Sequence, residues 1–284
     1  MRAAVLFAIT FFFLSCNTKD RYFKAIAAND VKLNPPQKGE WLYHHKEKGQ
    51  NFEEYKKAKP VRPTASCNII YLKPIGKFTP LEQSMLHLTQ QYVSIFFQQQ
   101  TVLLPAVADS TIPTRLKGDD NIQLLAPYVL DSLLKGKAPD NSIALMAITA
   151  KDLYPKEDWN YVFGIASYVD RVGVSSIYRL ENAHLDTTNF TRCLQRLINI
   201  ATHEIGHMLS MHHCTFARCV MNGSNTMSET DACPNRLCSE CQQKLSWNFQ
   251  YDNRKRLTQL CAFFKANNLK RDLRVLQLDL LAVE

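Results

Sequence analysis

Two histidines one helical turn apart carry the clearest chemical signal in the sequence. They lie in the segment His203-Glu204-x-x-His207. Histidines at positions i and i+4 of a helix share one face, so both imidazoles can bind a single Zn²⁺, and the Glu204 carboxylate can reach its open coordination position. Zinc lowers the pKa of its bound water toward neutrality, and Glu204 would take the proton as water attacks a carbonyl. Two surface histidines on a helix are the alternative.

A third histidine follows at a spacing that suits the same ion. His213 lies six residues beyond His207, so the helix would have to stop and the chain turn back to deliver it. Its neighbour His212 is the other candidate, and the spacing favours His213. We interpret His212 as a surface residue, or as a residue that contacts the zinc-binding histidines without binding the metal itself.

Four cysteines directly after these histidines have the spacing of a second metal site. They are Cys214, Cys219, Cys238 and Cys241. Four thiolates suit a tetrahedral, structural Zn²⁺ with no open position, which predicts two zinc ions per chain. Two disulfides are the alternative, because an exported protein can form them. We interpret the remaining cysteines as buried and inert: Cys67, Cys193, Cys233 and Cys261.

The elements that must position these residues follow from the spacing of apolar side chains. The histidine helix is predicted from Phe190 to about Leu209, after a cluster of N-capping residue types at 186–189. Upstream, the pattern predicts a helix over 81–95 and strands over 68–72, 101–104, 142–148, 162–167 and 172–180. One or two closing helices are predicted from residue 252 onward. This order favours a mixed α/β sheet in one catalytic domain.

Composition excludes several classes of protein. The chain has 284 residues, of which 46% are hydrophobic and 21% charged, so collagenous, low-complexity and largely disordered proteins are excluded. The formal net charge of +8 indicates a basic surface. Because the basic residues are dispersed along the chain, a nucleic-acid-binding zinc module is disfavoured and we expect no nucleic-acid partner.

The N-terminus has the order of residues typical of an export signal. Arg2 precedes an apolar run from Ala3 to Leu14, and Ser15-Cys16 follows. The small residue before Cys16 indicates a bacterial lipobox, which predicts lipidation of Cys16 and anchoring in the cell envelope. A secreted or periplasmic soluble protein is the alternative. We expect a signal peptide over 1–16, a basic, proline-punctuated extension over 17–66 and one catalytic domain over 67–284.

The two constellations together resemble the archaemetzincin family of zinc metallopeptidases. The resemblance rests on the zinc histidines, on Cys214-x4-Cys219-x-Met221 and on Cys238-x-x-Cys241. It extends upstream through 148–155, 162–167 and 171–175, and covers the chain from about residue 35. The main departure is Ser210, which stands where the family usually has a turn glycine.

The resemblance implies a metzincin-like α/β domain. It would have a mixed twisted sheet, an active-site helix, an upper lobe of about 67–210 and a helical lower lobe of about 211–284. Glu204 would be the general base, and Met221 would form the Met-turn beneath the catalytic zinc. By position we nominate Val172 to Leu180 as the sheet edge that binds substrate, with a core strand as the alternative, and Tyr178 as a candidate oxyanion stabiliser.

The predicted function is zinc-dependent hydrolysis of peptides or partly unfolded protein by a monomer. The rival hypothesis is a catalytically weak binding lipoprotein of the envelope, with disulfides in its cysteine segment and a vestigial zinc site. Ser210 supports the rival, because serine adopts the backbone conformation of a turn glycine only under strain.

Overall fold

A computed structural model describes residues 21–118, 121–181 and 184–283 of the chain. The predicted signal peptide and Cys16 lie outside these residues. Within them, no helix combines the length and the apolar character needed to cross a membrane.

A five-stranded sheet forms the centre of the fold, in the order β2-β1-β5-β8-β7. Its strands are β1 (Ile69–Ile75), β2 (Thr101–Leu103), β5 (Ser142–Thr149), β7 (Gly164–Ala166) and β8 (Val172–Ser176). All neighbours are parallel except β7, which runs antiparallel to β8 at one edge. Every residue of β5 is buried, as expected of a strand inside a parallel sheet.

The two faces of the sheet pack against different helices, because side chains alternate along each strand. Ile70 and Leu72 of β1 join one apolar cluster with α4 (Pro80–Phe97) and α6 (Phe190–Met208). Tyr71 and Ile75 join a second cluster with the π-helix η1 (Val129–Leu134). The smaller elements nearby are β3 (Thr114–Lys117), β4 (Asn121–Leu125), β6 (Asp152–Tyr154), which form a second sheet, and α5 (Ala126–Tyr128).

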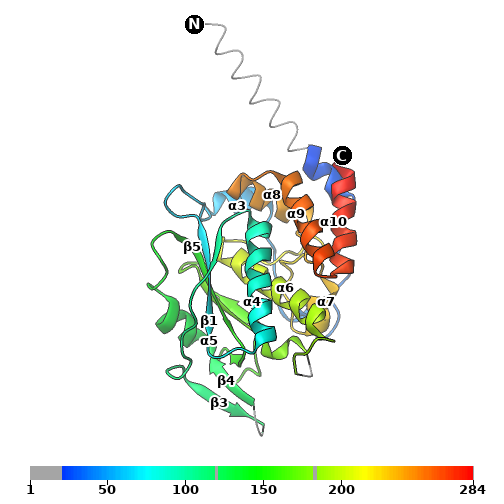
Figure 1. The fold of residues 1–284 in the computed structure, drawn as a ribbon. Coiled ribbons are helices and arrows are strands. Elements are labelled where there is room, and N and C mark those ends of the chain that lie inside the picture. Colours follow the sequence, from blue (N-terminus) through cyan, green and yellow to red (C-terminus); the bar gives the residue numbers. More distant parts are fainter. Residues whose placement is uncertain (1–20, 119–120, 182–183, 284) are drawn as a thin grey trace.

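Short helices precede the sheet, and a helical lobe follows α6 (Figure 1). The helices before the sheet are α2 (Trp41–His44) and α3 (Phe52–Lys57). Those after α6 are α7 (Met227–Ala232), α8 (Ser239–Phe249), α9 (Asn253–Ala266) and α10 (Lys270–Ala282), and the 3₁₀-helix η2 (Tyr178–Leu180) lies between β8 and α6. The extension docks on this lobe: the buried Arg236 guanidinium lies 2.6 Å from Asp30 and 2.6 Å from Asp279 of α10. This network joins Asp30, near the start of the described residues, to the last helix, α10.

The mixed α/β class and the principal elements are as predicted. The 81–95 and 190–209 patterns correspond to α4 and α6, and the closing helices are α9 and α10. The strand predicted over 172–180 is too long, because β8 ends at Ser176 and the chain continues as η2. The nomination of Val172 to Leu180 as the sheet edge is wrong. β8 pairs with β5 on one side and β7 on the other, and all five of its residues are buried. The edge at that end is β7.

The chain reverses at Ser210 directly after α6. Ser210 has φ = 67°, the left-handed region that costs a residue with a Cβ about 1 kcal/mol. Its N–H donates to His207 O over 2.8 Å, and the N–H of Met211 donates to Gly206 O over 3.0 Å. These two bonds form a Schellman motif with serine at the position that glycine usually occupies. The turn therefore keeps the usual geometry and carries the strain.

Replacing the strained serine should stabilise the protein. We expect Ser210→Gly to raise the free energy of unfolding by about 1 kcal/mol, because glycine adopts φ > 0 without a Cβ clash. Urea unfolding at fixed zinc concentration measures the change. Ser210→Ala keeps the Cβ and is the matched control. Equal stabilisation by both variants would show that the hydroxyl, and not the backbone conformation, is responsible.

Candidate metal centres and active-site cleft

Three histidines converge at the C-terminal end of α6. His203 and His207 share one helix face, and the turn at Ser210 brings back His213, while His212 is exposed. One ring nitrogen from each of the three lies within 4.8 Å of the others, and the Nε2 atoms of His203 and His207 are 2.9 Å apart. Imidazole nitrogens bind Zn²⁺ at about 2.0–2.1 Å. The donor set therefore fits one zinc ion with a position left open.

The Nδ1 atom of each imidazole lies beside an oxygen atom. His203 Nδ1 is 2.9 Å from Val220 O, and His207 Nδ1 is 2.7 Å from Met211 O. His213 Nδ1 lies 2.9 Å from both carboxylate oxygens of Glu47. A proton on each Nδ1 would donate to these oxygens, so the Nε2 lone pairs are free for a metal.

Burial keeps the helix histidines neutral. It lowers the pKa of His203 to about 3 and that of His207 well below its ordinary range, with neighbouring imidazoles adding to the effect. Both rings are therefore uncharged at neutral pH, as metal ligands must be. Desolvation also raises the pKa of Glu204 to about 8. A cation at the histidines would favour the carboxylate and lower that pKa again.

Two glycines allow side chains to pack closely at the histidine helix α6. Glu204 Oε1 lies 2.7 Å from where a Cβ on Gly164 of β7 would stand, so only glycine leaves room for the carboxylate. Met221 Sδ lies 2.5 Å from the corresponding point on Gly206. The buried Met221 side chain thereby packs against α6 at Gly206, which directly precedes His207 and follows His203 by three residues.

An open cleft of about 630 Å³ contains the three histidines and Glu204. The edge strand β7 lines it, and most of its remaining wall is aromatic, amide or apolar: Trp41, Trp159, Tyr161, Phe163, Tyr168, Asn199, Ile200 and Asn222 are among the lining residues. A sheet edge beside an open metal position can accept an extended chain by strand addition.

Tyr178 does not line this cleft. It begins η2, is 47% exposed and is not among the residues that line the cleft, so it is not placed where an oxyanion stabiliser would have to be. The tyrosine beside the histidines is Tyr168, whose hydroxyl is 2.9 Å from His207 Nδ1. Burial raises the pKa of Tyr168 to about 12, so the phenol keeps its proton at neutral pH. It lies in the short turn between β7 and β8, and no spacing pattern in the sequence marks it.

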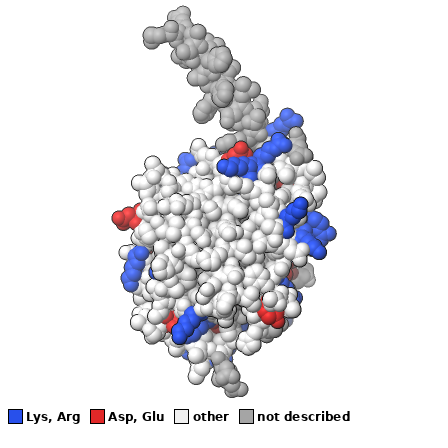
Figure 2. All heavy atoms as spheres, viewed as in Figure 1, with Lys and Arg blue, Asp and Glu red and all other residues white. Residues whose placement is uncertain are grey.

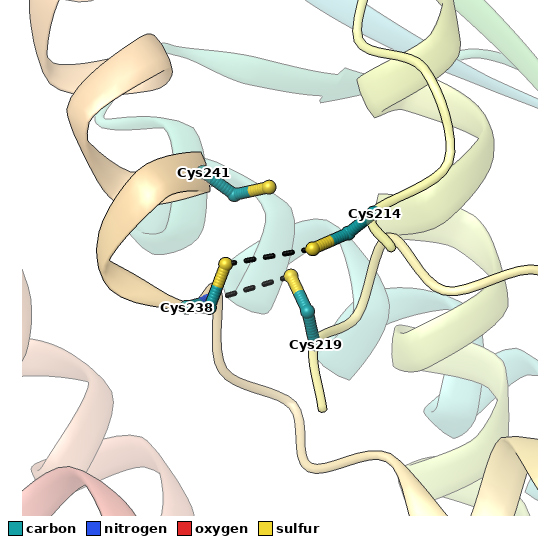
Figure 3. Close-up of side chains that lie close together, drawn as sticks. All are labelled: Cys214, Cys219, Cys238 and Cys241. Carbon is teal, nitrogen blue, oxygen red and sulfur yellow. Dashed lines mark hydrogen bonds between the residues drawn. The ribbon is translucent and has the colours of Figure 1, made fainter. Parts of the chain in front are cut away.

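Four buried cysteines form the second cluster. Their sulfur atoms lie within 4.8 Å of one another, and Figure 3 shows the four side chains pointing toward a common centre. Cys214 and Cys219 come from the loop after α6, while Cys238 is the N-cap of α8 and Cys241 lies in its first turn. Zn–S bonds of about 2.3 Å would place tetrahedral sulfurs about 3.8 Å apart. The cluster fits a closed, four-sulfur zinc site.

The surroundings of the cluster favour thiolates. The backbone N–H groups of Met221 and Cys238 donate to Cys219 Sγ over 3.5 and 3.4 Å, and the N-terminus of α8 adds a favourable dipole. Contact with the Cys219 and neighbouring sulfurs lowers the pKa of Cys214 far below its ordinary range. Contact with the Cys214 sulfur, together with burial, raises the pKa of Cys238 and Cys241. Ionisation of Cys238 and Cys241 beside the Cys214 thiolate would therefore be favoured by a bound cation.

The cysteines of the described residues are all unpaired. Cys214 Sγ and Cys238 Sγ, for example, are 3.6 Å apart, well beyond the S–S bond length of about 2.05 Å. The geometry thus favours the metal site over the disulfide alternative.

Thiol titration separates these alternatives in solution. In denaturant with a chelator and no reductant, we expect all eight cysteines beyond Cys16 to react, because removal of zinc leaves free thiols. Without the chelator, the four clustered cysteines should react more slowly in the folded protein. Two disulfides in the cluster would instead leave only four reactive thiols in denaturant, with or without the chelator.

Known proteins resemble this chain both in sequence and in fold. The sequence model of peptidase family M54 matches residues 119–247. Archaemetzincin-2 from Homo sapiens is 31% identical over 249 residues, which cover 76% of this chain and 68% of that protein. Archaemetzincin-2 from Macaca fascicularis is 30% identical over the same shares. The crystal structure of archaemetzincin from Methanopyrus kandleri aligns with a TM-score of 0.51 and 26% identity, covering 67% of this chain and 100% of that one.

Proposed function

The chain belongs to the archaemetzincin family of zinc metallopeptidases, and from that membership we propose that it hydrolyses peptide bonds with Glu204 as general base. The observation that carries the proposal is the convergence of three imidazoles and one buried carboxyl on an open cleft. His203, His207 and His213 would hold the catalytic zinc.

The chemistry divides between the metal and the chain. A bound zinc ion would supply Lewis-acid activation at the open position. Glu204 takes a proton from the attacking water as its oxygen bonds to the substrate carbonyl carbon, and returns a proton to the departing amine as the C–N bond breaks. Tyr168 lines the cleft, with its hydroxyl 2.9 Å from His207 Nδ1, and on substrate binding it would donate a hydrogen bond to the carbonyl oxygen as negative charge develops there.

The substrate would be a peptide or a partly unfolded segment bound beside β7. No strand among the described residues pairs with the outer side of β7, and its three residues line the cleft. An extended peptide could add to this edge with its scissile bond near Glu204. Edge binding favours an extended, unpaired segment, because strands inside a folded sheet already have their backbone groups paired.

The cysteine cluster would hold a second, structural zinc. Cys214 directly follows His213 in the chain, so an ion at the cysteines would restrain the backbone that delivers the third histidine. The rival hypothesis of a weak binding lipoprotein depended on disulfides and on strain at Ser210. The unpaired cysteines and the intact Schellman motif around Ser210 favour the peptidase.

Glu204→Gln tests the catalytic assignment. The variant keeps the shape of the side chain but removes its basicity, so we expect cleavage of an unfolded protein substrate to fall about 10²–10⁴-fold. Elemental analysis should still find about two zinc ions per chain, because neither cluster loses a ligand. Cleavage at the parental rate with both ions bound would remove Glu204 from the mechanism.

We propose that the mature protein is anchored in the bacterial cell envelope through Cys16. The support is the sequence order of Arg2, the apolar run and Ser15-Cys16. Across the face shown in Figure 2, lysines and arginines are spread around the rim, which does not resemble the concentrated patch of a nucleic-acid binder. A lipid anchor would place the cleft outside the cytoplasm.

Fractionation of cells tests the anchor. The parent should partition into detergent micelles and sediment with membranes, because a diacylated cysteine binds bilayers tightly. Cys16→Ala should appear in the soluble or secreted fraction. Cys67→Ala is the control, since it removes a thiol far from the signal. Equal partitioning of parent and Cys16→Ala would contradict lipidation at this residue.

A further inference from the structure

The N-terminal extension places a carboxylate against the third zinc histidine. Both oxygens of Glu47, between α2 and α3, lie 2.9 Å from His213 Nδ1. The contact is largely sheltered, since the His213 and Glu47 side chains are 17% and 29% exposed. The indole N–H of Trp41 donates to Glu47 Oε1 over 3.0 Å and fixes that carboxylate.

The same extension also secures the turn that delivers His213. Gln50 donates to Ser210 O over 3.2 Å and accepts from the N–H of His212 over 3.3 Å. Lys244 of α8 donates to Gln50 O. The buried Tyr55 hydroxyl donates to Leu209 O over 2.9 Å. Residues 47–55 therefore contact the turn at four positions between the end of α6 and the third histidine: Leu209, Ser210, His212 and His213.

His213 needs an outside partner more than the other two histidines do. His203 and His207 are fixed by α6, and their Nδ1 atoms face backbone carbonyls that the fold itself supplies. His213 lies beyond the helix, after a residue with positive φ. Its Nδ1 faces a side chain 166 residues away. A carboxylate on the far nitrogen of a zinc-binding imidazole fixes the tautomer and ring orientation and raises the basicity of the ligand.

We propose that Glu47 is a positioning residue for the catalytic zinc: it holds His213 with its proton on Nδ1 and its Nε2 directed at the ion. The inference rests on the proposed function of the three histidines. It assigns to the extension, which lies outside residues 119–247 matched by the family model, a direct role in building the metal site. The extension would then be part of the enzyme's active centre, rather than a spacer.

Zinc affinity of the full chain tests this role. Glu47→Ala removes the acceptor, and we expect the histidine site to bind zinc about 10–100-fold more weakly in chelator competition. Glu47→Gln keeps an acceptor oxygen but loses the charge, so its loss should be smaller. Glu53→Gln is the matched control on the same extension, because the exposed Glu53 pairs only with Lys56 among the described contacts. It should bind zinc as the parent does.

Cobalt substitution reports the ligand geometry independently of activity. Zn²⁺ is kept at the cysteines and Co²⁺ is loaded at the histidines alone, because a four-thiolate Co²⁺ site would itself absorb strongly in the visible region. The visible bands then report the histidine ligands only, and Glu47→Ala should shift them. A merely structural role would leave these bands unchanged, or would shift them together with the thermal midpoint.

The outcomes separate the two proposals. A parent that binds two ions and a Glu47→Ala variant with the same zinc affinity and the same cobalt spectrum would overturn the role of Glu47 alone. A parent that binds no ion at the histidines would overturn the proposed function and this inference with it. Partial recovery in Glu47→Gln relative to Glu47→Ala would support hydrogen bonding to Nδ1 as the physical cause.

Discussion

The covalent bond between His213 and Cys214 constrains the whole lower half of the molecule. One side chain of this pair points into the histidine cluster and the next into the cysteine cluster, so neither site can move without displacing the other. The chain must also leave α6 and reverse within the few residues around Ser210. That requirement explains why Ser210 has φ = 67° and is held by a complete Schellman motif. The backbone strain at this serine allows the turn that brings His213 to the other two histidines.

The remaining structure supports this pair from three sides. Gly206 admits Met221 against α6, and Gly164 on the edge strand admits the Glu204 carboxylate. α8 presents Cys238 and Cys241 from its N-terminus, where the helix dipole favours thiolates. The extension closes the third side through Glu47 and Gln50. Fold stability and catalytic geometry are therefore coupled through shared residues.

Sequence reasoning identified the features that depend on local spacing. Helix periodicity located α4 and α6, and fixed intervals located the histidines and cysteines that the structure brings together. It missed features that depend on contacts distant in sequence. The sequence of β8 is equally compatible with an edge strand and a core strand. Only its pairing with β7 in the folded sheet distinguishes the two. Tyr168 and Glu47 carry no spacing signal, because turns and a 166-residue separation bring them to the histidines.

Anomalous diffraction at the zinc absorption edge tests the central claim, that one chain reversal builds two linked metal sites. The account predicts two peaks per chain. One should be bonded to His203, His207 and His213 with an open position toward the cleft, and the other to four cysteine sulfurs. A single peak at the cysteines with the histidines dispersed, or disulfide density in place of the second peak, would contradict it.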